Sequence, residues 1–523
     1  MNTNQPRRPA GTPAGGRWAP AAHAEADVSL GPAGRDDTPT APRAACPGLV
    51  HLTAAAKQVI AACTRAGGRP LIVGGSVRDA LLGDHEPKDI DIEVYGVSDK
   101  ERFFSTMAEA GDWSDLVGRS FGVVKVHLDG ESFDVSLPRR DSKVGDGHRG
   151  FVVETADLTE SEAASRRDFT VNTLGWDPTT EELVDCWGGA ADIEAGVLRA
   201  TSPAFSEDSL RVLRGMQFTA RFGWRMDEAT VETCASLRGA YGQLATERVA
   251  EEWRKALTKG RHFPEMLSEL KRTGWLAHFP ELAALEGLEQ EPDWHPEGDV
   301  LTHSGLAAQV AADVADEAGL VGDDRYVVVA AALLHDVGKA TTTKRQVDAA
   351  GAERIVSPGH AEAGTAPAGS FLISIGCPEH LRRRVAPLVA EHMAAVAHQG
   401  GTTGVPTPRA VRRLARRLVP ATVTEWALVV RADRLGRGGN TERADDVERW
   451  AELAQKMGVE EAPARRLLRG DHLIAAGWPP GPRFRVVLDA AERAQDDGEF
   501  KDEPGAVEWF FDHYGYAIDA LRP

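Results

Sequence analysis

The spacing of hydrophobic and polar positions divides the chain into two parts. Between about residues 48 and 200, several short runs alternate with a period of two, among them IDIEVY, VVKVHL and ESFDVS. This period is typical of a strand with one buried face, and the Asp129-Gly130 pair between the last two runs predicts a hairpin turn. Helical runs lie among these strands. We therefore expect a mixed α/β domain over residues 47–200.

From about Phe205 onward, hydrophobic residues recur three and four positions apart, which predicts helices. A polar stretch that contains proline, EPDWHPEGD, separates a first helical region from a second one. A third helical region follows to the end of the sequence and is interrupted by GWPPGPRF. We expect a helical neck and body over residues 201–290 and a second all-α domain over residues 291–445. A helical C-terminal segment would follow over residues 446–523.

Composition adds one more segment and excludes two kinds of location. The first 46 residues are rich in Pro, Ala, Gly and Arg, which predicts a disordered tail over residues 1–46. No run approaches the roughly 18 apolar residues of a membrane helix, and no apolar core of a signal peptide is present. The five cysteines lack paired spacing. We expect a cytoplasmic protein with no membrane partner; the sequence does not indicate its oligomeric state.

Charge is distributed unevenly. The net charge of −19 argues against a nucleic-acid partner if the charge is spread over the whole surface. Between Leu381 and Leu418, however, there are eight arginines, and Glu391 is the sole acidic residue. This stretch predicts either a solvated helix surface or a local face for phosphate groups.

A pair of glycines lies between a predicted strand and a predicted helix, in VGGSVRD. Gly74 and Gly75 would allow backbone N–H groups to approach an anion, and the start of the helix favours negative charge. Arg78, one turn into the helix, would add a positive charge. By itself, the pattern also fits an ordinary tight turn.

Three carboxylates lie on one predicted sheet face. Asp89 and Asp91 are two positions apart on one strand, which suits Mg²⁺ because this ion takes one or two carboxylates together with phosphate oxygens. Asp134, on a later strand, would supply the third carboxylate that two neighbouring metal ions require. Taken alone, Asp89 and Asp91 also fit a solvated strand face. Glu93 continues this face without matching a motif, so we expect a surface charge there.

Two further polar clusters follow. In RRDFT, Arg166 and Arg167 could grip a triphosphate, or Arg167 could form a surface ion pair with Asp168. In EDSLRVLR, Asp208 and Arg211 are three positions apart and would share a helix face. An intrahelical salt bridge is the simpler interpretation of this second pair.

The order of these motifs resembles that of the class II tRNA nucleotidyltransferase and poly(A) polymerase family, over about residues 70–290. LVDCWGGAADI and ERVAEEWRKAL resemble two further motifs of the family. SKVGDGHRGF and SPAFSEDSLRVLR look most like the bacterial CCA-adding branch that also carries a phosphohydrolase domain. The resemblance implies an α+β multidomain chain in which a polymerase-β-like nucleotidyltransferase head precedes an all-α neck and body.

The resemblance also implies roles for single residues. Asp89 and Asp91 would bind both Mg²⁺ ions and Asp134 the catalytic one. Asp208 and Arg211 would select cytosine or adenine, since both bases present an amino group beside an acceptor nitrogen. The residues that would contact the nucleotide are Gly74, Gly75, Arg78, Arg167, Asp208, Arg211 and Arg214.

Two positions depart from the family pattern. Asp134 stands where many members have Glu, and its shorter side chain still supplies an oxygen ligand. Gln217 stands where some members have Arg, which removes one contact with a phosphate or with the backbone.

Histidines and aspartates mark the second domain. The apolar run VVVAAALLHDVGKA ends in His335 and Asp336, and a polar pair at the end of a buried helix needs partners. The order H…HD…D resembles that of the HD phosphohydrolase superfamily. By resemblance, the ligands of one divalent ion would be His303, His335, Asp336 and Asp433. His360 and His392 could complete a second site or bind phosphate. Such mixed ligands suit Ni²⁺ or Mn²⁺ better than Mg²⁺ alone.

The implied partner is tRNA. Its phosphates could be contacted by the arginines between Arg382 and Arg417. Further cations would come from the neck and body, namely Arg221, Arg225, Arg238, Arg254, Lys255, Lys259, Arg261, Lys271 and Arg272. GDHLIAAGWPPGPRF resembles a C-terminal RNA-binding segment of some members, so we expect residues 446–523 to bind tRNA.

The implied function is template-independent addition of CCA to tRNA 3′ ends from CTP and ATP by two-metal nucleotidyl transfer. The HD domain would hydrolyse phosphoesters such as 2′,3′-cyclic phosphates with a divalent metal. A poly(A) polymerase, or an enzyme that adds only CC or only A, is an alternative. These enzymes differ in a flexible loop after the third carboxylate, and a loop at about Asp141 to Leu158 favours complete CCA addition. An RNA-binding HD phosphohydrolase with an inactive head is an alternative of another class.

Overall fold

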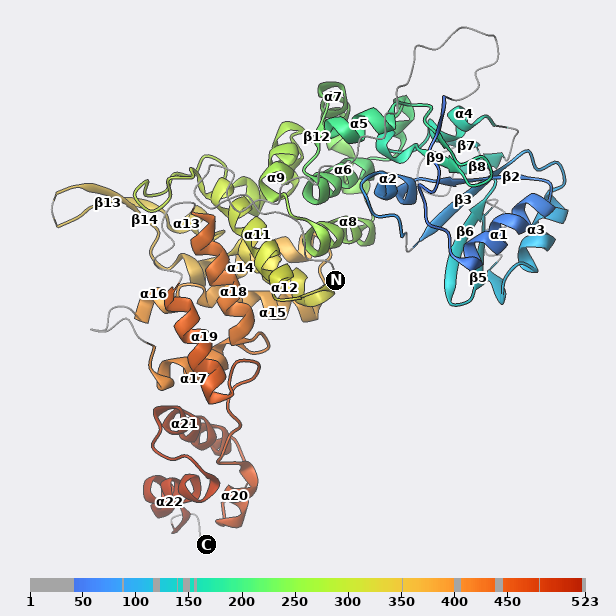
Figure 1. Ribbon diagram of the computed structural model, residues 1–523. Coiled ribbons are helices and arrows are strands. Elements are labelled where there is room, and N and C mark those ends of the chain that lie inside the picture. The colour runs from blue at the N-terminus through green and yellow to red at the C-terminus, as the bar shows by residue number, and fades with distance from the viewer. Residues whose placement is uncertain are drawn as a thin grey trace. The chain divides into compact units, whose positions relative to one another are not determined.

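The computed structural model divides into two compact units (Figure 1). The first unit extends to Ala190, apart from Asp168–Thr170, which belong to the second unit together with the residues from Ala191 onward. The structure describes residues 42–86, 89–115, 123–138, 140–143, 151–154, 158–349, 351–398, 406–437, 445–478 and 480–519.

A mixed sheet forms the centre of the first unit. Its strands, in the order in which neighbours pair, are β1 (Arg43–Ala45), β10 (Glu182–Val184), β9 (Gly175–Asp177), β2 (Arg69–Val73), β3 (Ile90–Tyr95), β6 (Glu131–Ser136), β5 (Val123–Leu128) and β4 (Trp113–Asp115). The β3–β6 pair is parallel, and the other pairs are antiparallel. A separate ribbon joins β7 (Arg140–Lys143) to β8 (Phe151–Glu154). Of the predicted loop from Asp141 to Leu158, residues 144–150 and 155–157 lie outside the described residues.

Two helices cover one face of this sheet, α1 (Ala54–Arg65) and α3 (Lys100–Ala108) (Figure 1). Ile92 of β3 and Val135 of β6 are fully buried on the apolar side of their strands. Because side chains alternate along a strand, Asp91 and Glu93 of β3 and Asp134 of β6 lie on the opposite face. The remaining helices are α2 (Gly75–Leu81), α4 (Glu160–Ala164) and α5 (Gly189–Ala195).

The predicted hairpin is confirmed. Its turn residues, Asp129 and Gly130, have φ angles of 51° and 79°. Two positive φ values in a two-residue turn match the right-handed twist of the strands, which is why Asp-Gly is favoured there.

One short strand lies where the sequence predicted only a tail. Arg43–Ala45 pair with β10, and the Arg43 guanidinium lies 2.6 Å from Glu160 and 3.3 Å from Glu182. Backbone pairing and ion pairs hold this strand, and neither produces a hydrophobic pattern that could be recognised in the sequence. Residues 1–41 of the predicted tail lie outside the described residues.

The second unit is almost entirely helical, as predicted. Its helices are α6 (Leu210–Phe222), α7 (Glu228–Ser236), α8 (Thr246–Lys259), α9 (Phe263–Arg272), α10 (Pro280–Ala283), α11 (Val300–Glu317), α12 (Gly322–Leu334), α13 (Lys339–Thr342), α14 (His360–Ser374), α15 (Glu379–Glu391), α16 (Ala394–His398), α17 (Pro408–Leu418), α18 (Val423–Gly436), α19 (Asp445–Met457), α20 (Gly470–Ala475), α21 (Arg483–Asp497) and α22 (Glu503–Asp519). Two strand pairs are added, β11 (Val197–Leu198) with β12 (Arg225–Met226) and β13 (Lys344–Val347) with β14 (Glu353–Val356). In the part of the chain that the structure describes, no helix has the length and apolar composition needed to span a membrane.

The predicted neck and the predicted metal domain share one core. Arg325 of α12 donates hydrogen bonds to the carbonyl oxygens of Leu257 (2.9 Å) and Gly260 (2.8 Å) at the end of α8. Trp253 of α8 packs edge-on against Phe371 of α14, with ring centroids 5.2 Å apart. The change of sequence pattern near residues 290–291 therefore does not coincide with a gap in packing.

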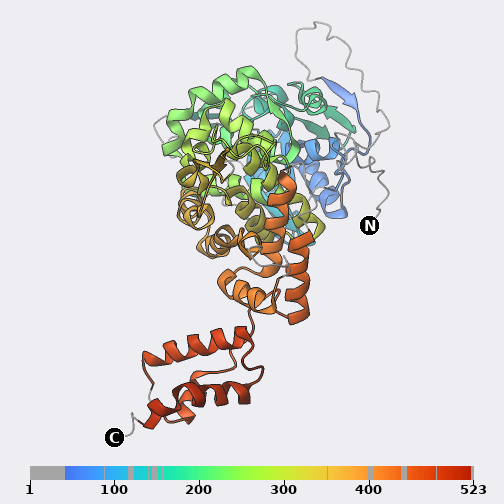
Figure 2. The same cartoon turned by 90° about the vertical axis from the view of Figure 1, so that its left-hand side faces the viewer.

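The last three helices have an apolar cluster of their own (red in Figure 2). Leu473, Trp478 and Phe510 are among its buried residues, and Trp478 meets Phe510 edge-on at 5.7 Å. The interruption GWPPGPRF follows α20, and its last two residues, Arg483 and Phe484, begin α21.

Candidate active site and candidate metal centre

Asp91, Glu93 and Asp134 lie on the sheet face opposite α1 and α3. The parallel register of β3 and β6 makes Asp91 and Asp134 direct Cα partners, and Asp89 lies two residues before Asp91. Burial by surrounding groups raises the pKa of Asp91, and the Asp134 carboxylate raises it further. Lys125 of β5 lies 3.2 Å from Asp134. A divalent cation would remove the repulsion between these carboxylates, and their hard oxygen atoms fit Mg²⁺.

The glycine turn lies against these carboxylates. Gly74 precedes α2 with a φ of 77°, which favours glycine. A Cβ atom at Gly74 would lie 3.5 Å from Arg167 Nη1 and 3.8 Å from Asp91 Oδ2. Gly75 begins α2, and a Cβ there would lie 3.5 Å from Arg78 Nη2. The turn thus brings backbone, arginine and carboxylate close together without an intervening side chain.

Arg78 is held inside the first unit. Its side chain lies 2.7 Å from Asp79 and donates a 2.6 Å hydrogen bond to the Asn172 side chain. Only 5% of the residue is exposed. Arg78 therefore ties α2 to the loop that contains Asn172.

Glu93 is more than the surface charge that we expected. Only 14% of its side chain is exposed, and the Tyr95 hydroxyl donates a 2.5 Å hydrogen bond to it. Arg167 Nη2 lies 3.5 Å from the same carboxylate oxygen, while Arg167 Nη1 donates to the Asn172 carbonyl at 2.9 Å. Burial and the Glu93 carboxylate raise the pKa of Tyr95, so the phenol remains a donor. The expectation failed because the partner arginine is 74 residues away in sequence.

In the second unit, Asp208 pairs with an arginine that sequence reasoning missed. Asp208 lies just before α6, and its carboxylate is 2.6 Å from Arg248 of α8. Burial raises the pKa of Asp208, but the bond to Arg248 outweighs it and lowers the pKa overall. Arg211 donates to the Ala204 carbonyl at 2.7 Å. Arg248 lies in the motif ERVAEEWRKAL, and that motif was the sequence signal that could have identified Arg248 as a functional residue.

Arg214 and Asp168 form a second pair in this unit. Arg214 Nε donates a 2.7 Å hydrogen bond to Asp168, which is 6% exposed and also accepts from the Phe169 backbone N–H. The alternative of a surface ion pair between Arg167 and Asp168 required an exposed Asp168. Asp168 is buried, so that alternative is wrong. Asp168 raises the pKa of Arg214, which stays positively charged.

Four predicted metal ligands meet in a buried cluster of the second unit. His303 Nε2 of α11 lies 3.2 Å from His335 Nε2 at the end of α12, and 3.1 Å from Asp433 of α18. His335 Nε2 lies 3.2 Å from Asp336 Oδ2. None of the four is more than 3% exposed. The order H…HD…D in the sequence thus corresponds to one compact group.

His360 and His392 join the same cluster from the other side of Asp336. Their Nε2 atoms are 3.0 Å apart, and His360 Nε2 lies 3.2 Å from Asp336 Oδ1. Asp336 thus directs one oxygen toward His335 and the other toward His360. This arrangement fits a carboxylate that bridges two cations.

The orientation of the rings shows that the cluster fits a metal. In His335, His360 and His392, Nδ1 lies 2.7–2.8 Å from the carbonyl oxygen three residues earlier. A carbonyl only accepts, so each Nδ1 carries the proton and each Nε2 presents a lone pair to the centre. Lone pairs that face each other at 3.0–3.2 Å require a cation or a proton between them. Imidazole and carboxylate donors together fit a divalent transition metal.

Charge in the cluster favours a cation at the same place. Burial lowers the pKa of His335, but Asp336 and Asp433 outweigh it and raise the pKa to about 10. Burial, reinforced by His335, lowers the pKa of His392 to about 3. The carboxylates of Asp336 and Asp433 thus favour a positive charge at this place.

A pocket of about 770 Å³ opens onto this cluster. Lys339 and Arg437, two cations that sequence reasoning missed, line it. Lys339 Nζ lies 2.7 Å from Asp336, and Arg437 Nη2 lies 2.8 Å from Asp433. Asp336 and Lys339 are three positions apart in the sequence, and this spacing could have predicted their ion pair.

The arginines of the basic stretch over α17 form ion pairs with carboxylates of neighbouring helices. Arg413 lies 2.9 Å from Asp497 of α21, and Arg416 lies 2.8 Å from Asp496. Ion pairs are also formed by Arg384, Arg409 and Arg417. These arginines connect helices of the second unit, and the side chains of Arg409 and Arg417 remain about half exposed.

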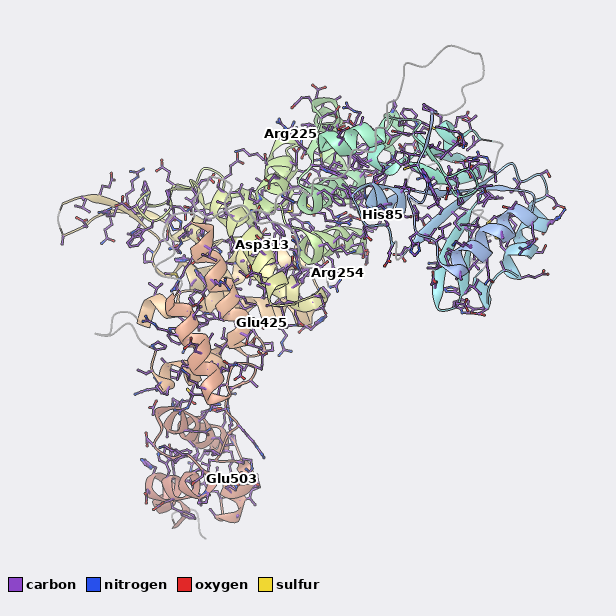
Figure 3. All side chains as sticks on the ribbon, viewed as in Figure 1. His85, Arg225, Arg254, Asp313, Glu425 and Glu503 are labelled. Carbon is purple, nitrogen blue, oxygen red and sulfur yellow. The ribbon has the colours of Figure 1, made fainter. Side chains whose placement is uncertain are left out.

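Many cations of the neck and body are paired as well. Arg225 lies 3.4 Å from Glu228, and Arg254 lies 2.8 Å from Asp323 (Arg225 and Arg254 are labelled in Figure 3). Further ion pairs involve Lys255, Arg261, Lys271 and Arg272. Exposed ion pairs of this kind are weak, so phosphate groups can compete for these cations.

Two known protein families match the chain. The family described as "Poly A polymerase head domain" matches residues 71–199, and the HD domain family matches residues 300–437. A multifunctional CCA protein of Xanthomonas oryzae pv. oryzae (strain MAFF 311018) is 35% identical over 437 residues, which is 81% of this chain and 97% of that protein. A multifunctional CCA protein of Stenotrophomonas maltophilia (strain K279a) is 40% identical over 283 residues, 52% of this chain and 64% of that protein.

Solved structures with the same fold include two CCA-adding enzymes. The enzyme of Bacillus stearothermophilus in complex with CTP has a TM-score of 0.59 and 19% identity, and the match covers 90% of this chain and all of that chain. The Thermotoga maritima enzyme complexed with tRNA has a TM-score of 0.52 and 16% identity, and the match covers 87% and 93%. At these identities the likeness concerns the fold.

Proposed function

The chain belongs to the family of multifunctional CCA proteins, and we propose that it adds CCA to the 3′ end of tRNA with CTP and ATP as substrates. The observation that carries this proposal is the pair of Asp91 and Asp134 on adjacent strands, beside a glycine turn and Arg167. An inactive head would not need Asp89, Asp91 and Asp134 close together.

In the head, each group has a proposed task. Asp89, Asp91 and Asp134 would hold Mg²⁺, which would activate the attacking hydroxyl and neutralise charge on the triphosphate. The backbone of Gly74 and Gly75 would contact phosphate oxygens. Arg167, held between Glu93 and the Asn172 carbonyl, would add a fixed positive charge.

The second unit would select the base. The bond to Arg248 lowers the pKa of Asp208, and an ionised carboxylate only accepts hydrogen bonds. An acceptor suits the amino groups of cytosine and adenine, whereas uracil has no such group. Arg211 would donate to a ring nitrogen or carbonyl, and Arg214, held by Asp168, would contact the nucleotide.

For the HD domain we propose metal-dependent hydrolysis of phosphoesters such as 2′,3′-cyclic phosphates. His303, His335, Asp336 and Asp433 would hold a divalent ion such as Ni²⁺ or Mn²⁺, which would act as a Lewis acid toward the phosphoester and its attacking water. Lys339 and Arg437 at the pocket would attract the anionic substrate.

The deciding experiment supplies tRNA that lacks CCA, Mg²⁺, and each labelled nucleotide in turn. We expect incorporation of two C residues from CTP, then one A from ATP, and no further extension. Long A tails would instead identify a poly(A) polymerase. Extension that stops after CC, or that requires a substrate ending in CC, would identify a partial enzyme, and no extension at all would favour an HD phosphohydrolase with an inactive head.

A further inference from the structure

Glu297, in the polar stretch EPDWHPEGD, is buried beside the histidine cluster. Only 7% of its side chain is exposed, and its Oε1 lies 2.7 Å from His303 Nδ1 and 2.9 Å from His295 Nδ1. We propose that Glu297 is a positioning residue of the metal centre, which fixes His303 with Nε2 toward the ion and strengthens it as a ligand. This inference rests on the proposed role of His303 as a ligand.

His303 differs from the other histidines of the cluster in what faces its Nδ1. The Nδ1 atoms of His335, His360 and His392 lie close to carbonyl oxygens of their own helical turns or loops. Nδ1 of His303 lies beside a carboxylate from a different segment. A carboxylate forms a stronger bond to an imidazole N–H than a carbonyl does and raises the basicity of the opposite nitrogen.

The second carboxylate oxygen of Glu297 is buried at a cost. Among the described residues, Glu297 Oε2 has no hydrogen-bond partner, so one oxygen lies close to both histidines while the other is desolvated. Burying a charged group in this way costs free energy that an apolar side chain would not cost. A role toward the metal ligand explains why the carboxylate is placed there.

Glu297 also connects the metal centre to the wall of the pocket. His295 lines the pocket, and its ring meets that of His303 edge-on with centroids 4.8 Å apart. Glu297 therefore holds one histidine that faces the ion and one that faces the pocket. The segment before α11, which the sequence marked as a linker, becomes part of the site.

The test measures binding of Co²⁺ by visible absorption in the full-length protein. An Asp91→Ala background removes the carboxylate site of the head from the titration. In that background, Glu297→Ala should weaken Co²⁺ binding by about 10-fold to 100-fold, as loss of a partner behind a metal ligand typically does. Glu297→Gln keeps the shape and an acceptor oxygen but loses the charge, so it should weaken binding less. Both variants should shift the Co²⁺ absorption bands.

Two control variants, His295→Ala and His303→Ala, separate the role of Glu297 from that of its two histidine neighbours. His295→Ala leaves the Glu297–His303 contact in place and should keep the affinity within about threefold; a loss equal to that of Glu297→Ala would overturn the inference. His303→Ala should abolish tight binding, and if it binds as the parent does, the assignment of the ligand itself is wrong. If His303→Ala loses the ion while both Glu297 variants bind like the parent with unchanged spectra, only the inference about Glu297 fails. Should Glu297→Ala unfold by circular dichroism, Glu297→Gln decides.

Discussion

Asp91 of β3 and Asp134 of β6 are Cα partners across the parallel strand pair of the sheet. Residues that are direct neighbours on adjacent strands have their Cβ atoms about 5 Å apart, so two carboxylates in this relationship repel unless a cation lies between them. The register of one strand pair therefore creates the central feature of the proposed nucleotidyltransferase site.

Removing Asp91 should abolish nucleotide addition. We expect Asp91→Ala to lower kcat by more than about 100-fold, because the remaining carboxylates cannot hold the ions against the triphosphate charge. The measurement is incorporation of labelled CTP into tRNA that lacks CCA. Glu109→Ala, at an exposed carboxylate of the same unit, is the matched control and should remain active. Full activity of Asp91→Ala would remove the basis for the metal assignment.

Glu93→Gln should raise KM for CTP and ATP more than it lowers kcat. The change removes the ionic partner of Arg167, a partly buried pair worth about 1 kcal/mol, which corresponds to about fivefold in KM. Steady-state kinetics with each nucleotide would measure it. Tyr95→Phe, which loses the hydroxyl but keeps the Glu93–Arg167 pair, should have a smaller effect. Equal effects of the two changes would show that packing, rather than the charge of Glu93, matters.

Arg248→Ala should relax the choice of base. Asp208 would lose the ion pair that holds its carboxylate in place, so its oxygens would discriminate less well in favour of the amino group of cytosine. We expect the ratio of kcat/KM for CTP over UTP to fall by about tenfold, in line with one lost hydrogen bond to a charged group. Arg248→Lys keeps the positive charge but loses the second N–H donor to Asp208. Its ratio of kcat/KM for CTP over UTP should lie between those of the wild type and Arg248→Ala. An unchanged ratio, with only overall activity reduced, would show that Arg248 supports the fold alone.

His335→Ala should eliminate phosphodiesterase activity and leave CCA addition intact, because the two sites use separate ligands. The assay is hydrolysis of a 2′,3′-cyclic nucleotide with Ni²⁺ or Mn²⁺, compared with the same protein after treatment with a chelator. Chelation followed by Ni²⁺ should restore hydrolysis in the wild type but not in the variant. If the wild type hydrolyses nothing with either metal, the proposed HD activity is wrong.

The contribution of Glu297 to stability should depend on pH in the metal-free protein. Burial raises the pKa of Glu297, but the bonds to His295 and His303 outweigh it and lower the pKa from 4.5 to about 2. A lowered pKa in the folded state means that stability is present above the unfolded value of 4.5 and is lost as pH falls toward about 2. Urea unfolding should therefore show a difference between wild type and Glu297→Gln that shrinks from pH 5 to pH 3. If the difference in free energy of unfolding between wild type and Glu297→Gln is the same at pH 5 and pH 3, the lowered pKa of Glu297 is wrong.

Local sequence patterns were sufficient to predict several strands and turns. They also gave the order along the chain of the candidate residues of both sites. The alternation in DIDIEVY predicted β3 with its carboxylates on one face, since side chains alternate by the geometry of any strand. The Asp129-Gly130 turn was predictable because so few residue pairs tolerate its backbone angles. The histidines and aspartates of the HD site were recognisable by their order along the chain.

The sequence by itself determined which faces of strands and helices are apolar, where the turns lie, and which residue types recur in the order of a known family. Only the tertiary structure decided the register that places Asp91 beside Asp134, the contacts of Glu93 with Arg167 and of Glu297 with His303, and the pairing of the α17 arginines with α21. The physical reason is separation along the chain. Periods of 2 and 3.6 follow from the local backbone, whereas an ion pair between residues tens of positions apart exists only after the whole core has packed.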